Sequence, residues 1–195
     1  MPEDVNFPEL LETDRLVLRR YTVADAPEIL ELVDKNRDRL LQNFSEIARN
    51  LSSDEDVESF TADKAEQWNA RKTFCFGIWC KDSNELIGQL QAKNIMWSVP
   101  SGELSYFIGG SFQRQGFASE SVSAMLCVAL GQLGFRRVFV RIIPSNKESI
   151  LLANKLGFKH EGLHRNEFRC GLGELHDVNY FSMTSDDFKS GLTSV

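Results

Sequence analysis

A strand, a glycine-rich turn and the start of a helix are predicted by the stretch Glu103-Leu-Ser-Tyr-Phe-Ile-Gly-Gly-Ser-Phe-Gln-Arg-Gln-Gly-Phe-Ala-Ser-Glu120. Its first six residues alternate, so that Leu104, Tyr106 and Ile108 share one face of an extended chain. Two glycines then end the strand, because glycine adopts positive φ without strain. From Ala118 onward apolar residues recur every three or four positions, as in a helix that buries one face. The stretch predicts a strand–turn–helix unit around which the other elements are arranged.

The turn between this strand and this helix has the features of a phosphate-binding loop. Residues 113–118 would direct several backbone N–H groups into one concavity at the helix N-terminus. Free N–H groups and the positive end of the helix dipole attract phosphate there. The loop is not of the Walker type, because no Gly-Lys-Ser/Thr follows it. It is not a dinucleotide fingerprint either, because Ser111 and Arg114 interrupt the Gly-x-Gly-x-x-Gly pattern.

Composition limits the class of protein. The chain has 195 residues and a formal net charge of −6, which argues against a general nucleic-acid binder. No apolar run approaches the ~20 residues that span a bilayer, and the first residues lack the pattern of a signal peptide. Four cysteines without a Cys-x-x-Cys pair indicate reduced, buried thiols. We expect a cytoplasmic protein with one domain over residues 1–195, a core at about 12–187 and loosely ordered termini.

The other elements follow from periodicity and capping signals. Strands are predicted at residues 15–21, 74–80, 86–92, 103–108, 137–143, 158 onward and 178–183. Helices are predicted around residues 29–41, after Ser53, from Ala118, and between a cap at Ser145 and a stop at Gly157. The order βααβββαβαββ predicts an α+β fold in which helices cover one sheet.

The loop also resembles the Gln/Arg-x-x-Gly-x-Gly/Ala signature of the GCN5-related N-acetyltransferase (GNAT) superfamily, with Gln113, Gly116 and Ala118 in its defined positions. The likeness extends over roughly residues 12–187 and is greatest to the Rim-type branch, the ribosomal-protein N-terminal acetyltransferases. Four stretches carry it: Glu12-Thr-Asp-Arg-Leu-Val-Leu-Arg19, Gly102-Glu-Leu-Ser-Tyr-Phe-Ile108, Asn146-Lys-Glu-Ser149 with Leu156-Gly-Phe158, and His176-Asp177. The resemblance implies a mixed, mostly antiparallel sheet of six to seven strands flanked by about four helices.

The resemblance also implies acetyl-CoA as co-substrate and assigns residues to it. The backbone N–H groups of Phe107 and Ile108 would polarise the acetyl carbonyl, and Asn146 would bond the pantetheine arm. The loop would hold the pyrophosphate through Gln113, Arg114, Gln115, Gly116, Phe117, Ala118 and Ser119. Arg114 either adds a phosphate contact or points to solvent.

Two residues are candidates for the chemistry. A carboxylate beside an aromatic ring can act as a general base, and Glu103 shares its strand face with Phe107. The resemblance gives Glu103 that role, directly or through a water; otherwise it is a surface or edge-strand glutamate. Ser149 would protonate the departing thiolate, since we see no tyrosine placed for it. Asn146 and Ser149 equally fit the first turn of a capped helix. No metal is expected.

The acceptor is the most open part of this interpretation. The resemblance favours the N-terminal α-amine of a protein such as a ribosomal protein, attacked directly in a ternary complex. Many relatives carry a tryptophan after the first helix, where this chain has Phe44, which leaves the acceptor in doubt. The alternatives are a polyamine, an amino acid or an antibiotic as acceptor, or a non-catalytic CoA-binding sensor. No contact with nucleic acid or membrane is expected, and both monomer and homodimer remain open.

A second motif points to different chemistry. The stretch His160-Glu-Gly-Leu-His164 matches the zinc-protease pattern His-Glu-x-x-His. That chemistry needs both histidines on one face of a helix. The segment follows the helix stop at Gly157 and contains Gly162, which disfavours a helix by about 1 kcal/mol. We therefore expect a strand here, where the two histidines could share a face, and leave ion binding open.

Overall fold

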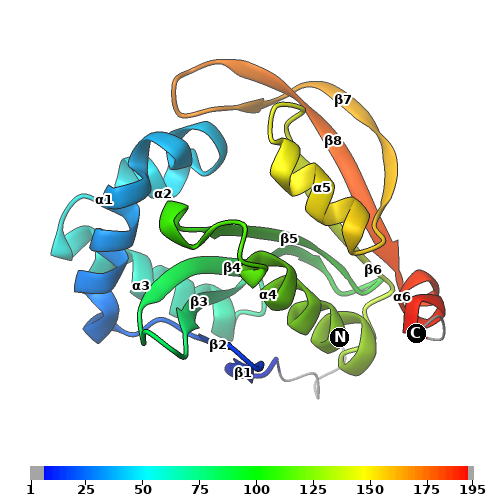
Figure 1. Cartoon of the computed structure of the whole chain (residues 1–195), viewed down its shortest axis with the longest axis horizontal. Helices are drawn as coiled ribbons and strands as arrows, with labels where there is room; N and C mark the ends of the chain where they lie inside the picture. Colours follow the sequence, from blue (N-terminus) through cyan, green and yellow to red (C-terminus); the bar gives the residue numbers. More distant parts are fainter. Residues whose placement is uncertain (1–6, 193–195) are drawn as a thin grey trace.

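One eight-stranded sheet organises the chain (Figure 1). The computed structural model describes residues 7–192. The strand order is β1-β2-β3-β4-β5-β6-β8-β7, and every neighbouring pair is antiparallel except β5 and β6. The strands are β1 (Leu10–Glu12), β2 (Leu16–Arg19), β3 (Phe74–Cys80), β4 (Leu86–Met96), β5 (Ser101–Ile108), β6 (Arg137–Ile142), β7 (Lys159–Arg169) and β8 (Leu175–Thr184).

Helices lie on both faces of the sheet. Leu104 and Ile108 of β5 belong to a buried cluster with α4, whereas Phe107, on the opposite side of the same strand, belongs to a cluster with α1, α2 and α3. The described helices are α1 (Ala26–Asn43), α2 (Ser45–Asn50), α3 (Asp54–Asn69), α4 (Phe117–Leu126), α5 (Lys147–Lys155) and α6 (Ser185–Leu192). Short 3-10 turns precede α1 and α4, and a π-helical turn, Cys127–Gln132, continues α4.

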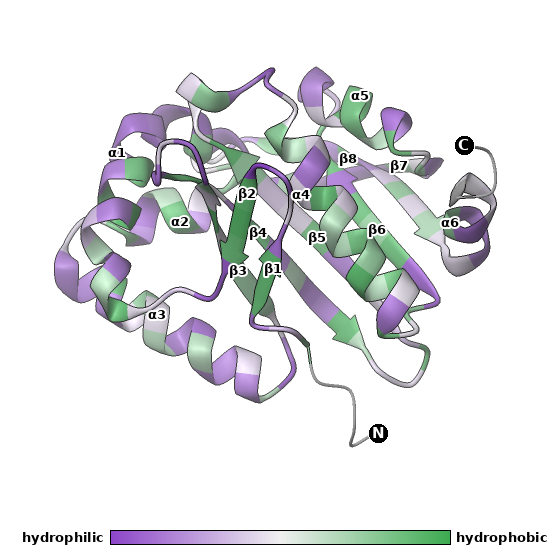
Figure 2. Cartoon of the chain, turned by 60° about the horizontal axis from the view of Figure 1, so that its bottom comes forward, coloured by the Kyte–Doolittle hydropathy of each residue, from purple (hydrophilic) through white to green (hydrophobic). Residues whose placement is uncertain are grey.

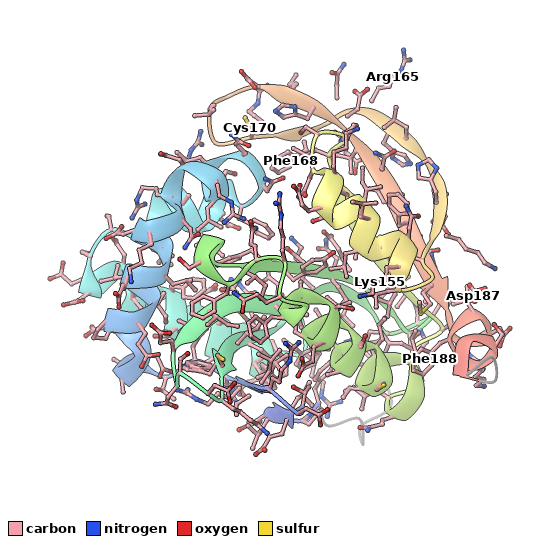
Figure 3. All side chains as sticks on the ribbon, in the orientation of Figure 1. Lys155, Arg165, Phe168, Cys170, Asp187 and Phe188 are labelled. Carbon is pink, nitrogen blue, oxygen red and sulfur yellow. The ribbon has the colours of Figure 1, made fainter. Side chains whose placement is uncertain are left out.

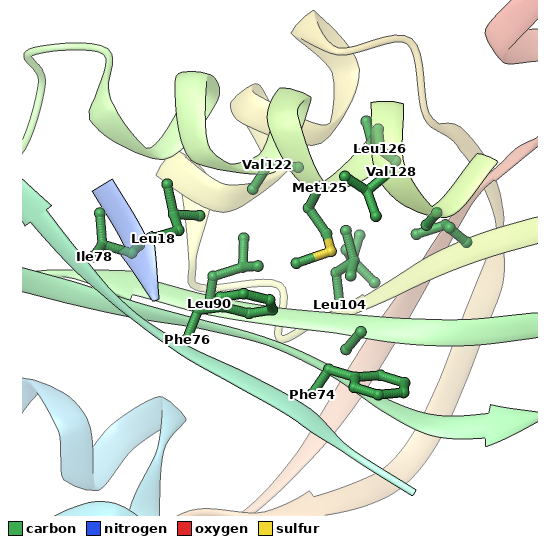
Figure 4. Close-up of a cluster of buried hydrophobic side chains, with 14 of the residues drawn as sticks. Leu18, Phe74, Phe76, Ile78, Leu90, Leu104, Val122, Met125, Leu126 and Val128 are labelled. Atoms are coloured by element: carbon green, nitrogen blue, oxygen red, sulfur yellow. The ribbon is translucent and has the colours of Figure 1, made fainter. Parts of the chain in front are cut away.

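The larger cluster is the core beneath α4. Figure 4 shows Val122 and Met125 of α4 directed at Leu90 and Phe76 of the sheet. Hydrophobic residues concentrate on the strands in the middle of the sheet, whereas hydrophilic residues cover much of α1 and α3 (Figure 2). Burying such apolar area contributes roughly 25 cal/mol per Å² and fixes the strand β5 from which the site is built.

The predicted α+β class and element order are confirmed, but the predicted numbers of strands and helices were too low. The eighth strand is β1, a three-residue strand that exists only through its pairing with β2. The additional helices are α2 and α6. Elements this short carry little periodicity of their own, since their positions are set by the tertiary contacts they make.

The core is also wider than predicted. Phe7 is 1% exposed and stacks on Phe74, and Phe188 of α6 packs against the same cluster. The prediction of loose termini concerns residues 1–6 and 193–195, which lie outside the described residues. No helix within residues 7–192 is long and apolar enough to cross a membrane. All four thiols are free; three are buried as expected, but Cys127 is exposed.

Capping residues set the helix boundaries near the site. Gly157 has φ +85° and ends the turn after α5, as predicted for a helix stop. The cap of α5 is Asn146 rather than the predicted Ser145: its side chain accepts the Ser149 N–H at 3.2 Å. Asparagine is among the best N-cap residues, so a one-residue shift of the boundary keeps the helix well capped.

The sheet opens in its middle. β5 and β6 pair only at Ser101–Glu103 with Arg137–Phe139, and beyond Glu103 the two strands share no ladder. Within the described part of the chain, the second half of β5 therefore has β4 on one side and no strand on the other. This separation creates the space in which the candidate site lies.

Candidate active site

A cleft of about 760 Å³ runs past the open end of β5. Its walls are the end of β5, the N-terminus of α4, one side of α5 along its length and the C-terminal half of α1. Of the predicted cofactor residues, all but Gln115 line it: Phe107, Ile108, Gln113, Arg114, Gly116, Phe117, Ala118, Ser119 and Asn146. The predicted residues are thus brought together on one surface.

The loop before α4 presents backbone donors to this cleft. Gly116 is the N-cap of α4 with φ +86°, and no side chain caps the helix. The first hydrogen bond of α4 joins the Glu120 N–H to the Gly116 carbonyl at 3.0 Å. The N–H groups that have no partner inside the helix are therefore those of the residues just before Glu120. Uncapped N–H groups at the positive end of a helix suit a phosphate, and the loop fits the pyrophosphate of CoA on that ground. Arg114 has φ +61°, and its side chain is 86% exposed and 3.9 Å from Glu148.

The two predicted backbone donors of β5 differ in direction. Gly109 N–H bonds the Ile87 carbonyl at 2.7 Å, and Phe107 pairs with Gln89 in the same ladder. Because successive amides of a strand point to opposite edges, the Phe107 amide faces β4 and the Ile108 amide faces the gap. Ile108 is therefore the better placed of the two to bond an acyl oxygen.

Glu103 lies in a second, smaller hollow of about 100 Å³ between β5 and β6. Its side chain is buried, and its Oε2 accepts Asn94 Nδ2 at 2.6 Å and lies 3.1 Å from Arg141 Nε. Lys93 Nζ lies 3.6 Å from Oε1. The partners of this carboxylate are cations and an amide rather than the aromatic ring that the sequence suggested, because Phe107 packs on Phe44 instead. Glu103 is not a surface residue.

Arg141 links Glu103 to the C-terminal hairpin. Its Nη1 lies 3.3 Å from Glu167 of β7, which also accepts the Tyr180 hydroxyl and lies 2.8 Å from His164 Nδ1. Burial acts against the charge on Arg141, but Glu103 outweighs it and raises the pKa of the guanidinium. Arg141 is thus a permanent cation between two carboxylates.

The cleft and the hollow meet at a small group of side chains. Asn43, Phe44, Tyr106, Asn146 and Ser149 line both spaces. Asn146 donates from Nδ2 to Asn43 Oδ1 at 3.3 Å, while its own Oδ1 caps α5. The alternative that Asn146 serves the helix is therefore realised in the structure, and its Nδ2 joins α5 to α1.

Tyr106 is the residue that the sequence reasoning missed. Burial raises the pKa of Tyr106 to about 12, and a hydrogen bond with Ser149 acts in the opposite direction. Two hydroxyls thus lie side by side where the two spaces join. The alternation of β5 placed Tyr106 on the same face as Leu104 and Ile108, but nothing in the sequence showed that β6 leaves this strand beyond Glu103.

The ends of α1 and of the β7–β8 hairpin complete the walls. Asn36 accepts Gly110 N–H at 2.8 Å, which ties α1 to the loop after β5.

Figure 3 shows Phe168 and Cys170 on the hairpin; Phe168 lines the hollow. Beyond it Gly171 N–H bonds the Leu41 carbonyl at 2.6 Å, which joins the hairpin to α1. Phe44, at the end of α1, lines both the hollow and the cleft.

The His-Glu-x-x-His segment lies on β7, as expected, and not on a helix. His160 contacts Asn179 at 3.0 Å, and His164 pairs with Glu167, so each histidine has a partner of its own. The described residues bring together a different group of possible ligands, Cys170, Glu174 and His176, whose ligand atoms lie within 4.8 Å of one another at the hairpin tip.

Comparison with known proteins identifies the family of this chain. The family model of the acetyltransferase (GNAT) domain matches residues 15–159. The chain is 30% identical to the uncharacterized N-acetyltransferase YoaA of Bacillus subtilis (strain 168), over 91% of this chain and 97% of that protein. It is 27% identical to the [ribosomal protein uS5]-alanine N-acetyltransferase of Escherichia coli (strain K12), over 95% and 96%. A structure of RimL, a ribosomal L7/L12 α-N-protein acetyltransferase in complex with coenzyme A, superposes with TM-score 0.84 at 24% identity, over 92% and 99%.

Proposed function

The chain belongs to the GNAT acetyltransferase family and is an acetyl-CoA-dependent N-acetyltransferase, and we propose that its acceptor is the N-terminal α-amine of a protein such as a ribosomal protein. The observation that carries the proposal is the junction of two spaces at Tyr106, Asn146 and Ser149. The cleft offers backbone N–H groups that can bind a phosphate. The hollow holds the buried carboxylate of Glu103 beside that junction. An amine in the hollow can thus meet an acetyl group held in the cleft.

The likeness to protein N-terminal acetyltransferases supports this acceptor. The E. coli relative is, by its name, an enzyme that acetylates the alanine of ribosomal protein uS5. In this chain the hollow lies between β5, β6 and the β7–β8 hairpin, with Phe44, Phe168 and Val178 among its lining residues. A chain end that presents its α-amine to Glu103 would place its first side chain against this apolar lining.

We assign the following roles to the residues of the junction. Acetyl-CoA supplies the acetyl group as a thioester, so that a C–N bond forms to the acceptor while the C–S bond breaks. The loop at residues 113–119 holds the pyrophosphate, and the Ile108 amide bonds the acyl oxygen as it gains negative charge. Glu103 takes a proton from the attacking amine, directly or through a water, with Oε1 as its less occupied oxygen. Ser149 gives a proton to the departing sulfur.

Tyr106 supports Ser149 in this scheme. A hydroxyl whose pKa is raised to about 12 stays protonated throughout the working range of pH, so Tyr106 can donate a hydrogen bond to the serine oxygen when Ser149 gives up its proton. We expect Ser149→Ala to lower kcat about 100-fold, near the lower limit for loss of a general acid. Tyr106→Phe should lower kcat about tenfold, the effect of roughly 1.4 kcal/mol on the barrier, and leave the affinity for CoA unchanged.

The double variant checks whether the two hydroxyls act together. Tyr106→Phe combined with Ser149→Ala should be no slower than Ser149→Ala alone, because residues that act as a unit are not additive. Steady-state rates at saturating acetyl-CoA measure this. A normal kcat for Ser149→Ala would remove the serine from the mechanism, and strict additivity would separate Tyr106 from it.

An acetyl-transfer assay tests the acceptor. The enzyme is offered peptides with free and with blocked N-termini, together with polyamines, amino acids and aminoglycosides, and release of free CoA thiol is followed. Turnover only with free N-termini supports the proposal. Turnover only with a small amine would replace it, and binding without turnover of any amine would indicate a CoA-binding sensor.

A further inference from the structure

An arginine from the turn before β2 bonds the back of the phosphate loop. Arg15 Nη1 donates to the Gln115 carbonyl at 2.9 Å. The rest of its guanidinium pairs with Glu120 in the first turn of α4, at 2.7 Å from Nε and 2.6 Å from Nη2. The guanidinium carbon of Arg15, Cζ, lies 4.5 Å from the centre of the Phe117 ring. Gln115 and Glu120 lie 100 and 105 residues further along the chain.

Glu120 is held from the same turn. Its Oε1 accepts Thr13 Oγ1 at 2.5 Å and the Arg15 backbone N–H at 3.0 Å. Burial acts against the charge, but these hydrogen bonds and Arg15 outweigh it and lower the pKa of the carboxyl. Glu120 is therefore a fixed anion, held from residues 13–15 at both of its oxygens.

The bond to the Gln115 carbonyl determines where the next amide points. In a trans peptide the C=O of one residue and the N–H of the following residue point in opposite directions within one plane. With the Gln115 carbonyl turned toward Arg15, the Gly116 N–H must point the other way, toward the cleft that Gly116 lines. The Gln115 side chain does not line the cleft and donates from Nε2 to the Ser111 carbonyl at 3.1 Å.

The loop needs such support because its backbone is unusual. Arg114 has φ +61°, a conformation that non-glycine residues rarely adopt and that persists only where the surroundings impose it. Arg15 lies directly behind the next bend: a Cβ at Gly116 would stand 3.2 Å from Arg15 Nη2.

We propose that Arg15 and Glu120 are positioning residues that hold the phosphate loop in its binding conformation by fixing the Gln115–Gly116 peptide. They touch the loop from the side away from the cleft and line neither the cleft nor the hollow. The inference rests on the proposed pyrophosphate role of the loop. Its consequence is specific: loss of the pair weakens CoA binding and leaves kcat at saturating acetyl-CoA within about twofold, since neither residue reaches the reacting atoms.

Calorimetric titration with CoA tests the pair. We expect Arg15→Gln and Glu120→Gln each to raise Kd about tenfold, which is about 1.4 kcal/mol. The double variant should be no weaker than the worse single variant, because each removes the same unit. Arg15→Lys should also bind weakly, since one ammonium cannot bond both the Gln115 carbonyl and Glu120 as the guanidinium does. The control is Arg137→Gln, which breaks an Arg–Glu pair between β6 and β7 and should leave Kd unchanged.

Several results would overturn the inference. If Arg15→Lys bound CoA with full affinity, Arg15 would contribute only its positive charge and not its specific hydrogen bonds. If Arg15→Gln left the Kd for CoA unchanged, the pair would contribute to the stability of the fold alone. If the Arg15 variants fold poorly, hydrogen exchange in the milder variant Glu120→Gln tests the same inference. The amides of residues 114–117 should exchange faster than in the unmodified protein, whereas those of β5 should exchange at the same rate. If the loop does not hold the pyrophosphate, Gly116→Asp will keep its affinity for CoA, which separates that failure from a failure of the Arg15–Glu120 pair. If Gly116→Asp loses its affinity for CoA while Arg15→Gln keeps it, only the role of the pair is contradicted.

Discussion

Replacing Gly116 with aspartate is expected to abolish CoA binding, with a rise in Kd of at least about 100-fold. Gly116 caps α4 at φ +86°, where its N–H and those of the following turn form the donor surface of the loop. A side chain at this position would start 3.2 Å from Arg15 Nη2, so the aspartate carboxylate would compete with the Gln115 carbonyl and Glu120 for that guanidinium and would add negative charge beside the loop. The same change costs backbone strain, because aspartate must adopt a left-handed conformation. Calorimetry with CoA measures the loss.

Two further variants separate charge from strain. Asparagine has the shape of aspartate without its charge and tolerates positive φ, so Gly116→Asn should bind CoA more tightly than Gly116→Asp. Gly134 has φ +69° and does not line the cleft, and a Cβ added there would meet no atom of the described residues within 4 Å. Gly134→Asp should therefore lose stability but keep its affinity. Unchanged affinity in Gly116→Asp would refute the assignment of the loop.

Replacing Glu103 with glutamine is expected to lower kcat by about 100-fold or more, the range of a lost general base. Glutamine keeps the size of the side chain and its oxygen can still accept from Asn94 or Arg141, but it cannot take a proton. The affinity for CoA should stay nearly intact, because Glu103 lies in the hollow and not in the cleft. Rates at saturating acetyl-CoA, with thermal melting to confirm folding, measure the effect.

Glu167→Gln is the matched comparison for this variant. Glu167 contacts the same Arg141 but lines neither space, so its loss also removes a carboxylate partner from that cation. A slow Glu103→Gln beside a faster Glu167→Gln assigns the base to Glu103. A normal rate in Glu103→Gln with a slow Glu167→Gln would move the role to the hairpin, and normal rates in both would require another base or none.

The parts of the site that the sequence predicted are those with local signals. The strand at residues 103–108, the loop at 113–118 and the stop at Gly157 each depend on alternation or on glycine, and each is found where expected. The loop residues share one cleft because strand, turn and helix are consecutive. The role of Gln113 to Ser119 in holding CoA stays a prediction.

The parts that were missed depend on contacts between distant segments. β5 and β6 separate after Glu103, and only that separation brings Tyr106 to Ser149 and opens the hollow. The cations around Glu103 come from β4 and β6, so an aromatic neighbour in the same strand gave the wrong environment. Likewise Arg15 and Glu120 lie 105 residues apart, and no spacing rule relates them.

The acceptor assignment is tested most directly by locating the acetyl group after reaction. A peptide with a free α-amine and one internal lysine is incubated with the enzyme and isotopically labelled acetyl-CoA, and fragment-ion mass spectrometry identifies the labelled nitrogen. The proposal predicts label on the α-amine alone and none on a peptide with a blocked N-terminus. Label on the lysine, or on an added small amine in preference to the peptide, would contradict it.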